Sequence, residues 1–401
     1  MRHLFVTQDY PPDLGGMARR HVELCRRLAP DPVVVSTVSA AGSEAFDRGE
    51  PYTLERLPFS FTQAKVFRRQ LQWASAITRI VTRQGADVIH LGNVRPCGYA
   101  VAIASRRMPF AYLVYVNGGD LLRERDKTAR SAVKRWSARD ILGRAAGVVA
   151  NSRWTADLAA EVMARVGVRR PPPVAAIDLG TDPAHFAPSR DTGALRARFA
   201  LGDAPVALTV ARLVPHKGQD VALRAVAALS SRHPGLRYLV AGEGHDLPRL
   251  RRLAESLGIA GRVTFAGPLS DAEVAEAYAT ADVYLGLSRV DGGVNVEGFG
   301  ISFVEAAASG TPSVAGDSGG VRSAVRDGET GFVVDPMDTA QAAAALGRLL
   351  DDAQLRRRMG EAGRRSVETH YNWARVARET RDFARASLEA WRASTRGAGT
   401  Q

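Results

Sequence analysis

Residues 206–244, VALTVARLVPHKGQDVALRAVAALSSRHPGLRYLVAGEG, decide the fold that we expect for this chain. The short apolar runs 206–210 and 238–242 are typical of strands, and residues 219–231 between them have helical periodicity. A strand, a helix and a second strand, with a turn rich in glycine or basic residues after each strand, indicate a βαβ unit. The stretch therefore predicts parallel strands that carry ligands at their carboxyl ends.

The same alternation continues on both sides of this stretch. In the first half, strands are expected at 4–7, 33–38, 88–91, 112–116 and 147–150, with helices such as 17–28 and 68–83. In the second half, further strands are expected at 263–266, 283–287 and 313–315, and helices at 247–256, 271–279, 302–308 and 339–350. Because a Pro-, Gly- and Asp-rich linker at 170–188 separates the two series, we expect an α/β fold with two Rossmann-like, doubly wound domains facing an interdomain cleft.

Composition excludes several classes of protein. Of 401 residues, 45% are hydrophobic and 24% charged, which is ordinary for a globular chain. The only two cysteines, Cys25 and Cys97, do not make a disulfide framework or a cysteine zinc module. The sequence has no apolar run long enough to span a bilayer, and its N-terminus lacks the pattern of a secretory signal. A cytoplasmic protein is therefore expected.

The positive charge is concentrated in the first half. Residues 1–186 hold 27 Lys and Arg against 17 Asp and Glu, a net +10, whereas residues 187–401 hold 27 against 25. A basic surface attracts nucleic acid, an anionic membrane or an acidic small molecule. Nucleic acid is not expected, since no recognised binding module accompanies the charge. Solvated helix faces in an arginine-rich chain are the plain alternative.

The most specific motif is residues 297–305, EGFGISFVE. Its two carboxylates, Glu297 and Glu305, are eight residues apart at a loop-to-helix junction, which over a helix is roughly 12 Å. They are too far apart to act on one atom, but they suit the two ends of one elongated ligand. The backbone N–H groups of residues 299–301, which are Phe299, Gly300 and Ile301, would form an anion site between them. A helix with Glu297 near its positive end and a solvated Glu305 is the structural alternative.

A basic turn follows the first strand of the second half. Arg212 and Lys217 lie in ARLVPHKG, at the carboxyl end of that strand. A diphosphate leaving group suits such a pair, because Arg forks onto two oxygens and Lys adds a movable charge. The sequence has no Asp-x-Asp triplet, so no metal site and no divalent metal clamp are expected. The two cations would then neutralise the departing charge themselves.

The first strand of the chain is followed by Gly15-Gly16 rather than by G-x-G-x-x-G. No acidic residue stands in the position that binds a ribose in nicotinamide enzymes. A dehydrogenase is therefore not expected.

Together these motifs resemble those of retaining glycosyltransferases of family 4 (GT4), which have the GT-B fold. The resemblance covers nearly the whole chain and is closest to the bacterial phosphatidylinositol mannoside mannosyltransferase type. It implies an N-terminal acceptor-binding domain over residues 1–186 and a C-terminal nucleotide-sugar-binding domain over residues 187–373. It also implies that a final helix, 374–401, crosses back to the first domain.

The resemblance implies a role for each motif. Glu297 would hold hydroxyls of the donor sugar, Glu305 the ribose, and Arg212 and Lys217 the diphosphate. Gly15 and Gly16 would let backbone approach the donor phosphates, and Leu269 would lie near the base of a GDP- or UDP-linked sugar. Hexosyl transfer would keep the anomeric configuration by front-face attack and would need no cofactor. A double displacement would require a carboxylate beneath the anomeric carbon, and the sequence offers no candidate.

The chain departs from the family where many relatives carry a His-Gly pair, since it has Asn117-Gly118 there. Asn117 can exchange hydrogen bonds with the donor but cannot become cationic. It would otherwise serve only a glycine-rich turn. Asp120 would contact the acceptor or cap the following helix, and the sequence does not separate the two.

Aromatic and basic residues interleave twice in the first half, as at a membrane interface. The first group is Phe59, Phe61, Lys65, Phe67, Arg68, Arg69 and Trp73, and the second is Arg123, Arg125, Lys127, Arg130, Lys134 and Arg135. The acceptor would then be a lipid, a saccharide or a small molecule. The basic N-terminal domain would make peripheral contact with the inner face of an anionic membrane. Exposed helices with partly buried aromatics are the alternative.

Two other functions compete with hexosyl transfer. A sugar-nucleotide epimerase or a phosphorylase with the GT-B fold would use the same donor site. A sugar-nucleotide-binding protein without activity is the candidate from a different class, and the substitution at Asn117 favours it slightly. The four charged residues of the donor motifs weigh against it.

Overall fold

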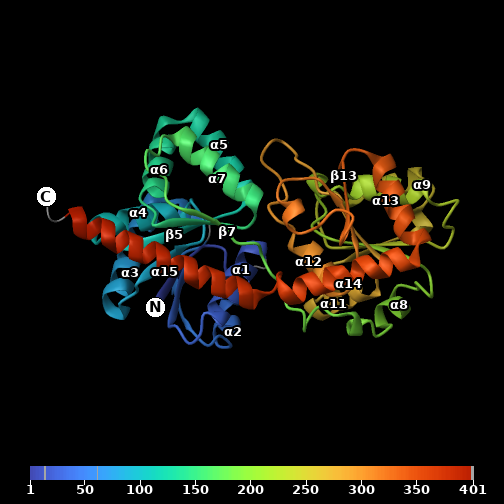
Figure 1. Ribbon diagram of the computed structural model, residues 1–401, viewed down its shortest axis with the longest axis horizontal. Coiled ribbons are helices and arrows are strands. Elements are labelled where there is room, and N and C mark those ends of the chain that lie inside the picture. The colour runs from blue at the N-terminus through green and yellow to red at the C-terminus, as the bar shows by residue number, and fades with distance from the viewer. Residues whose placement is uncertain (13–14, 61, 399–401) are drawn as a thin grey trace. The chain divides into compact units, whose positions relative to one another are not determined.

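The computed structural model describes residues 1–12, 15–60 and 62–398, and it divides into two compact units. Unit 1 comprises Met1–Asp178 together with the chain from Trp373 onward, and unit 2 comprises Leu179–Asn372. Each unit is an open parallel sheet covered by helices (Figure 1). The α/β fold with two Rossmann-like sheets is confirmed.

Unit 1 has a seven-stranded sheet in the order β3-β2-β1-β4-β5-β6-β7. Its strands are β1 (His3–Val6), β2 (Val33–Val38), β3 (Thr53–Leu57), β4 (Val88–Leu91), β5 (Ala111–Val116), β6 (Gly147–Ala150) and β7 (Val174–Ala176). Its helices are α1 (Gly16–Arg27), α2 (Ser43–Asp47), the short 3₁₀ turn η1 (Gln63–Lys65), α3 (Phe67–Gln84), α4 (Cys97–Arg107), α5 (Gly118–Arg130), α6 (Ala132–Gly143), α7 (Arg153–Val166) and α15 (Trp373–Ala398).

Unit 2 has a six-stranded sheet in the order β10-β9-β8-β11-β12-β13. Its strands are β8 (Val206–Val210), β9 (Arg237–Ala241), β10 (Val263–Gly267), β11 (Val283–Gly286), β12 (Ser313–Gly316) and β13 (Gly331–Val334). Its α-helices are α8 (Ala194–Arg198), α9 (Gln219–Ala228), α10 (Leu247–Ser256), α11 (Asp271–Thr280), α12 (Ile301–Ala308), α13 (Thr339–Asp351) and α14 (Ala353–Thr369). The 3₁₀ turns are η2 (Pro188–Arg190), η3 (Pro215–Lys217), η4 (Ala260–Arg262) and η5 (Val321–Ser323).

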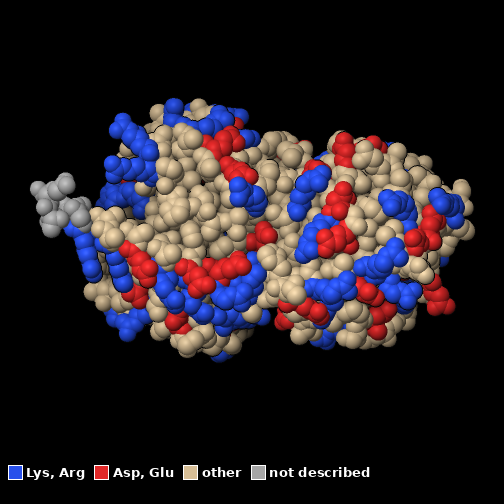
Figure 2. Space-filling model, viewed as in Figure 1, with Lys and Arg blue, Asp and Glu red and all other residues tan. Residues whose placement is uncertain are grey.

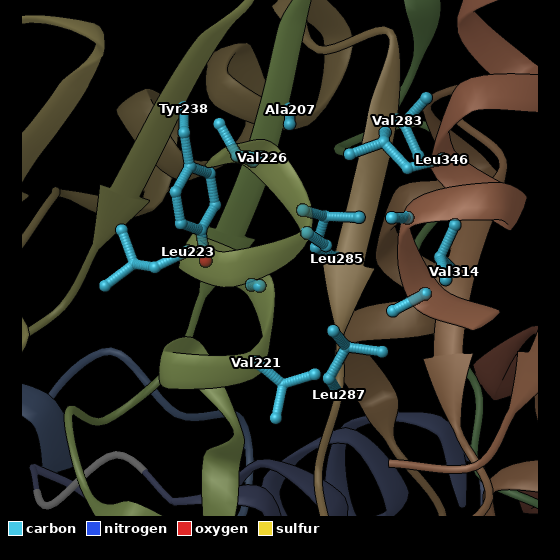
Figure 3. Close-up of a cluster of buried hydrophobic side chains, with 14 of the residues drawn as sticks. Ala207, Val221, Leu223, Val226, Tyr238, Val283, Leu285, Leu287, Val314 and Leu346 are labelled. Carbon is cyan, nitrogen blue, oxygen red and sulfur yellow. The ribbon is translucent and has the colours of Figure 1, made fainter. Parts of the chain in front are cut away.

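The central strands read as continuous apolar runs because helices cover both of their faces. In unit 2, Leu285 of β11 and Val314 of β12 lie in one cluster with Leu223 and Val226 of α9 and with Leu346 of α13 (Figure 3). All five side chains are buried. This packing of α9 and α13 onto the sheet holds the strand ends, and the loops that follow them, in fixed positions.

Both sheets reverse their strand order at one place, the topological switch point. In unit 1 it lies between β1 and β4, which pair in parallel with His3 opposite Val88. In unit 2 it lies between β8 and β11, with Val283 opposite Ala207. Ligands of doubly wound sheets bind outside the carboxyl ends of the strands at this point. Each unit therefore has one favoured place for a ligand.

Three strands were not predicted: β3, β7 and β13. β3 and β7 are the two edges of their sheet, and β13 is an edge of the other. β3 carries Glu55 and Arg56, and β7 is three residues long, so neither makes the apolar run that marks a central strand. β13 follows a glycine-containing turn that masks its short apolar run.

Helix α15 begins at Trp373 and packs in unit 1 against α1, β5 and β6. The guanidinium of Arg381 donates to the carbonyl oxygen of Leu28 at 2.7 Å and to Asp31 at 3.2 Å. The structure places the unit boundaries after Asp178 and after Asn372, whereas the sequence analysis placed them after residues 186 and 373. Among the described residues, no helix is both long and apolar enough to cross a bilayer.

Candidate active site

The switch point of unit 2 carries an ion pair between two of the predicted site residues. Lys217 lies in the turn after β8, and Glu297 lies in the loop between β11 and α12. The Lys217 ammonium donates to Glu297 Oε2 at 2.7 Å, and the two side chains are 22% and 17% exposed. The pair therefore lies beyond the carboxyl ends of the strands and is partly exposed, so that a ligand can reach both groups.

A glycine positions this lysine. Lys217 ends η3, and the next residue, Gly218, has φ +72° and caps α9. A Cβ at Gly218 would collide with the carbonyl oxygen of Leu287, the residue after β11. Only glycine combines the left-handed conformation with this close approach, so the turn after β8 is pressed against the end of β11. That contact brings residues eighty positions apart in the sequence together.

Arg212 lies on the same turn, with an exposed side chain. Its backbone carbonyl accepts from the Gln219 amide at 3.0 Å, which fixes the chain there, and its guanidinium makes no ion pair with any residue of the described part. Burial lowers the pKa of the neighbouring His216, and the charges of Lys217 and Arg212 lower it further. The turn after β8 thus brings the charges of Lys217 and Arg212 close to one another and to His216.

The N-terminus of α12 lies beside this turn. Gly300, the residue before the helix, has φ +93°, and no side chain of the described residues caps the helix there. The backbone carbonyl of Glu297 accepts from Gly320 N at 2.8 Å, and Phe299 is buried. The predicted segment, Phe299 to Ile301, therefore leads into a helix whose first N–H groups have no capping side chain. An anion is the natural partner for such groups.

Glu305 lies one helical segment further, and it is buried rather than solvated. It is 5% exposed, and the hydroxyl of Tyr278 donates to its Oε2 at 3.1 Å. The alternative of a solvated Glu305 is therefore wrong. Leu269 is half-buried and follows β10, two strands away from β8 on one side of the switch point. The nucleoside contacts of Glu305 and Leu269 stay predictions.

Unit 1 has a cavity of about 460 Å³ at its own switch point. Asp9, which follows β1, and Asn93, which follows β4, both line it. The Asn93 amide donates to Asp9 Oδ2 at 2.9 Å, so a hydrogen bond joins the loops after the two strands. The cavity thus occupies in unit 1 the place that the Lys217–Glu297 pair occupies in unit 2.

Three oxygens of this cavity's lining residues are buried and have no hydrogen-bond partner among the described residues: Gln8 Oε1, Asn93 Oδ1 and Asp120 Oδ2. Asn93 itself is 3% exposed. Buried acceptors of this kind cost free energy unless a donor satisfies them. A ligand with several hydroxyl groups would supply such donors.

Asp120 caps the start of α5, one of the two roles left open by the sequence, and its contact with the acceptor stays a prediction. Its Oδ1 accepts from the backbone N–H groups of Asn117 and Leu121, each at 2.8 Å, at the start of α5. Its Oδ2 is one of the three cavity oxygens without a partner among the described residues. Burial raises the pKa of Asp120 to about 7, against the lowering effect of the two backbone hydrogen bonds.

Cationic side chains surround the polar cavity. Five of its lining residues are basic: Lys65, Arg95, Arg123, Lys127 and Lys134. Arg95 is paired with Glu124 at 2.6 Å, and Lys134 donates to the Tyr99 hydroxyl at 3.0 Å. Burial alone would raise the pKa of Tyr99, but the hydrogen bond from Lys134 and the charge of Arg95 hold it below its ordinary value. Three lining residues are acidic, Asp9, Asp120 and Glu124, so basic residues exceed acidic ones by two, and the cavity suits a polar ligand that carries some negative charge.

The fold does not require glycine at Gly15 or Gly16. Neither has positive φ, and a Cβ on either would meet none of the described atoms within 4 Å. The approach of the donor phosphates to these two glycines stays a prediction.

Not every aromatic residue of the first predicted aromatic and basic group lies at the surface. Trp73 and Phe59 are buried, and the Trp73 indole donates to Ser36 Oγ at 3.0 Å. Phe67 is 69% exposed, and Phe61 lies outside the described residues.

The sequence predicted Asp120 and the basic residues of the two patches. The other residues that line the cavity were not predicted. Asp9 and Asn93 lie just after two predicted strands, and that position was the available signal. They were overlooked because β1 and β4 were not identified as neighbours at the switch point. Among the described residues, no three His, Cys, Asp or Glu side chains gather as a metal site.

Two parallel Rossmann-like sheets, and a cationic turn beside a helix N-terminus in one of them, are features expected of a glycosyltransferase that uses a nucleotide sugar. Comparison with known proteins supports this class. The model of the family described as "Glycosyltransferase Family 4" matches residues 14–183, and that of "Glycosyl transferases group 1" matches residues 192–366. The chain belongs to glycosyltransferase family 4.

Similar proteins cover nearly all of the chain. A GDP-mannose-dependent alpha-(1-6)-phosphatidylinositol monomannoside mannosyltransferase of Mycobacterium tuberculosis is 31% identical over 96% of this chain and 98% of its own. A D-inositol 3-phosphate glycosyltransferase of a Nocardioides species is 30% identical over 95% of this chain and 87% of its own. Among solved structures, Anabaena HepE in complex with UDP and glucose has a TM-score of 0.76 at 20% identity, covering 95% and 98% of the two chains. Sucrose-phosphate synthase from Thermosynechococcus elongatus has a TM-score of 0.77 at 23% identity, covering 97% and 99%.

Proposed function

We propose that this enzyme transfers a hexosyl group from a nucleotide-diphosphate sugar to a hydroxyl of its acceptor, with retention of configuration and without a metal ion. The observation that carries the proposal is the Lys217–Glu297 pair at the switch point of unit 2, beside the uncapped start of α12. One group of the pair suits a diphosphate and the other suits sugar hydroxyls.

In this proposal the sugar's anomeric C–O bond to the diphosphate breaks, and the bonding electrons leave on the diphosphate oxygen. Lys217, Arg212 and the first N–H groups of α12 then stabilise that charge as it develops. The cations Lys217 and Arg212 are already in place in the free protein, where their charges add to the lowering of the His216 pKa by burial. Few side chains must therefore reorganise when the charge appears.

Retention fits the position of Glu297. A double displacement needs a carboxylate free to attack the anomeric carbon. The Glu297 carboxylate is instead paired with Lys217, in a geometry suited to accepting hydrogen bonds from hydroxyls. The acceptor oxygen would attack from the face that the diphosphate leaves, and its proton would pass to that leaving group.

For the acceptor, we propose an inositol that carries a phosphate group. The names of the two relatives share this chemistry, since one acts on a phosphatidylinositol mannoside and the other on inositol 3-phosphate. The cavity of unit 1 offers unpartnered oxygens for ring hydroxyls and cationic side chains for a phosphate. GDP-mannose is the donor to test first, because the first of these relatives is named for it.

The direct test measures product formation. The purified enzyme is incubated with GDP-mannose or UDP-glucose and either phosphatidylinositol monomannoside or inositol 3-phosphate, with and without EDTA. We expect a glycosylated product with the anomeric configuration of the donor, formed at the same rate in EDTA. An inverted product would overturn the retaining mechanism, and loss of activity in EDTA would overturn metal independence.

The same assay separates the competing functions. An epimerase would change the donor sugar without an acceptor, and a phosphorylase would require inorganic phosphate. A binding protein would leave every donor intact, and the bound donor would still raise its melting temperature. At a donor concentration of a hundred times the dissociation constant, the folded state would gain about 2.7 kcal/mol of stability. Any of these results would replace the proposal.

A further inference from the structure

His216 occupies the middle of the 3₁₀ turn η3, between the two cations Arg212 and Lys217 that the sequence predicts for the donor diphosphate. Its side chain is half-buried. Its imidazole ring forms no hydrogen bond and no ion pair with any residue that the structure describes. Its ring nitrogens are therefore available to a ligand that binds at this turn.

Backbone contacts hold His216 beside the ion pair of the candidate site. Its carbonyl oxygen accepts from Arg289 N at 2.8 Å, at the start of the loop that leads from β11 to Glu297. The Arg289 guanidinium is in turn held by Asp220 of α9, at 2.8 and 3.1 Å. Because Lys217 directly follows His216 in this turn, a diphosphate bound by the lysine would lie next to the histidine.

Four charged groups act on His216. Lys217 and Arg212 lie on its own turn, and Glu297 and Asp291 lie on the loop before α12. Burial is the largest effect and lowers the pKa of His216, the two cations lower the pKa further, and the two carboxylates oppose them. Since an ordinary histidine already loses its proton near pH 6.5, His216 is mostly neutral in the free protein above about pH 7.

The charge of this turn differs from that of the surface of unit 2 in Figure 2, where Lys and Arg side chains lie beside Asp and Glu. On α14, for example, Arg364 is paired with Glu368 at 2.7 Å. In the turn after β8, Lys217 has an acidic partner, whereas Arg212 and His216 have none in the part of the chain that the structure describes. The turn can therefore offer two basic side chains to an anion without breaking an ion pair.

We propose that His216 is a third ligand of the donor diphosphate and that it binds as the imidazolium, taking up a proton together with the donor. A diphosphate brings negative charge to the place where Lys217 and Arg212 repel a proton, so the protonated ring becomes the favoured form. The proton comes from the solvent, and no covalent bond forms or breaks. The inference rests on the proposed function, since it assigns one more residue to the same donor site.

The consequence is a donor affinity that depends on pH. Histidine is the only residue type of this group that ordinarily changes charge between pH 5 and pH 8. The hydrogen bond from a charged imidazolium to a phosphate oxygen is stronger than that from a neutral ring. The donor should therefore bind more weakly as pH rises and His216 loses its proton.

The test is isothermal titration calorimetry of GDP-mannose with the full chain at pH 5.5 and pH 8. This donor suits the test because its diphosphate is substituted at both ends and stays fully ionised over the whole range. We expect the dissociation constant to rise about tenfold from the lower to the higher pH, because a hydrogen bond from a charged group is lost. At pH 7, titrations in two buffers of different ionisation enthalpy should show uptake of part of a proton for each donor bound.

Two variants of His216 separate charge from structure. His216→Gln stays polar but cannot take up a proton, so it should match the wild type at pH 8 within about twofold and bind about tenfold more weakly at pH 5.5. His216→Arg carries a permanent charge and should bind tightly at both pH values, which a merely structural role would not restore. His233→Gln is the matched control, since His233 is also half-buried but precedes β9 and lies at the amino ends of the strands.

Equal dissociation constants at the two pH values, or the same pH dependence in His216→Gln, would overturn the inference and leave the proposed function standing. A pH dependence that His233→Gln also removes would overturn it as well. Proton-linked binding without hexosyl transfer to any acceptor would overturn the proposed function alone. Failure of both GDP-mannose and UDP-glucose to bind at pH 5.5 would overturn both.

Discussion

The switch points of unit 1 and unit 2 lie at the same place in the strand order but hold different kinds of polar group. In unit 2 the groups are a basic and an acidic side chain that form an ion pair, with Lys217 Nζ 2.7 Å from Glu297 Oε2. In unit 1 the wall of the cavity holds an amide–carboxylate hydrogen bond, Asn93 to Asp9, and oxygens that have no partner in the part of the chain that the structure describes. Sheet topology thus fixes where a ligand binds, and the loops decide what chemistry it meets.

The difference also indicates a division of labour. A preformed charged pair stabilises charge that develops during a reaction. Unpartnered oxygens beside cations favour binding of a polar, anionic molecule. We therefore expect substitutions in unit 2 to lower turnover and substitutions in unit 1 to weaken acceptor binding.

The largest effect should come from removing the cation of unit 2. Lys217→Ala should lower kcat by a factor of about 10² to 10³, because the leaving diphosphate loses a preorganised charge. Steady-state kinetics with GDP-mannose and phosphatidylinositol monomannoside measure it. Arg252→Ala, at an exposed arginine of α10, is the control and should change kcat less than twofold. A loss below tenfold at Lys217 would contradict the leaving-group role.

Central elements and local motifs of the fold were predictable, and long-range pairs were not. β2 (Val33–Val38) and β8 (Val206–Val210) match their predicted ranges, because strands buried on both faces make apolar runs that need no context. Lys217 and Glu297 were both named, but their contact depends on Gly218 pressing against Leu287, which no local pattern reveals. Asn93 and Asp9 carry no motif at all.

The second prediction contrasts the glycines of the two units. Gly218→Ala should destabilise the protein by at least about 2 kcal/mol, because alanine is strained at φ +72° and its Cβ would strike the backbone of Leu287. Gly15→Ala and Gly16→Ala should change stability by less than about 0.5 kcal/mol, since nothing described crowds them. Chemical denaturation measures all three.

Measuring turnover then tests whether Gly15 and Gly16 contact a ligand. If ligand phosphates approach Gly15 or Gly16, the alanine variants should keep wild-type stability and lose turnover. Unchanged turnover in both would remove the ligand role of these glycines.

A third prediction concerns Asn93, whose Oδ1 has no hydrogen-bond partner among the described residues. Asn93→Ala should raise the KM for the acceptor about tenfold and leave GDP-mannose affinity unchanged, because only the acceptor site loses its hydrogen-bonding group. Asn151 is the matched control, since it is also buried in unit 1 with an unpartnered Oδ1 but does not line the cavity. A similar rise in KM for Asn151→Ala would mean that Asn93 acts through folding rather than through contact.

The smallest effect should be a pH-dependent one at Asp120. Its pKa is raised to about 7 in the folded protein and is about 3.9 in an unfolded chain, so the folded state binds the proton more tightly. Stability from this group is therefore full below pH 4 and is lost as pH rises through 7. Asp120→Asn, which keeps an oxygen for the start of α5, should gain on the wild type as pH rises. The upper limit of this gain in stability, over the whole range from pH 4 to pH 7, is about 4 kcal/mol. Between pH 5 and pH 8 we expect a gain of about 1 kcal/mol, because the residue is only half-buried. Thermal unfolding at the two pH values measures the difference. A variant that loses stability relative to the wild type at pH 8 would show that the carboxylate is ionised and stabilising there.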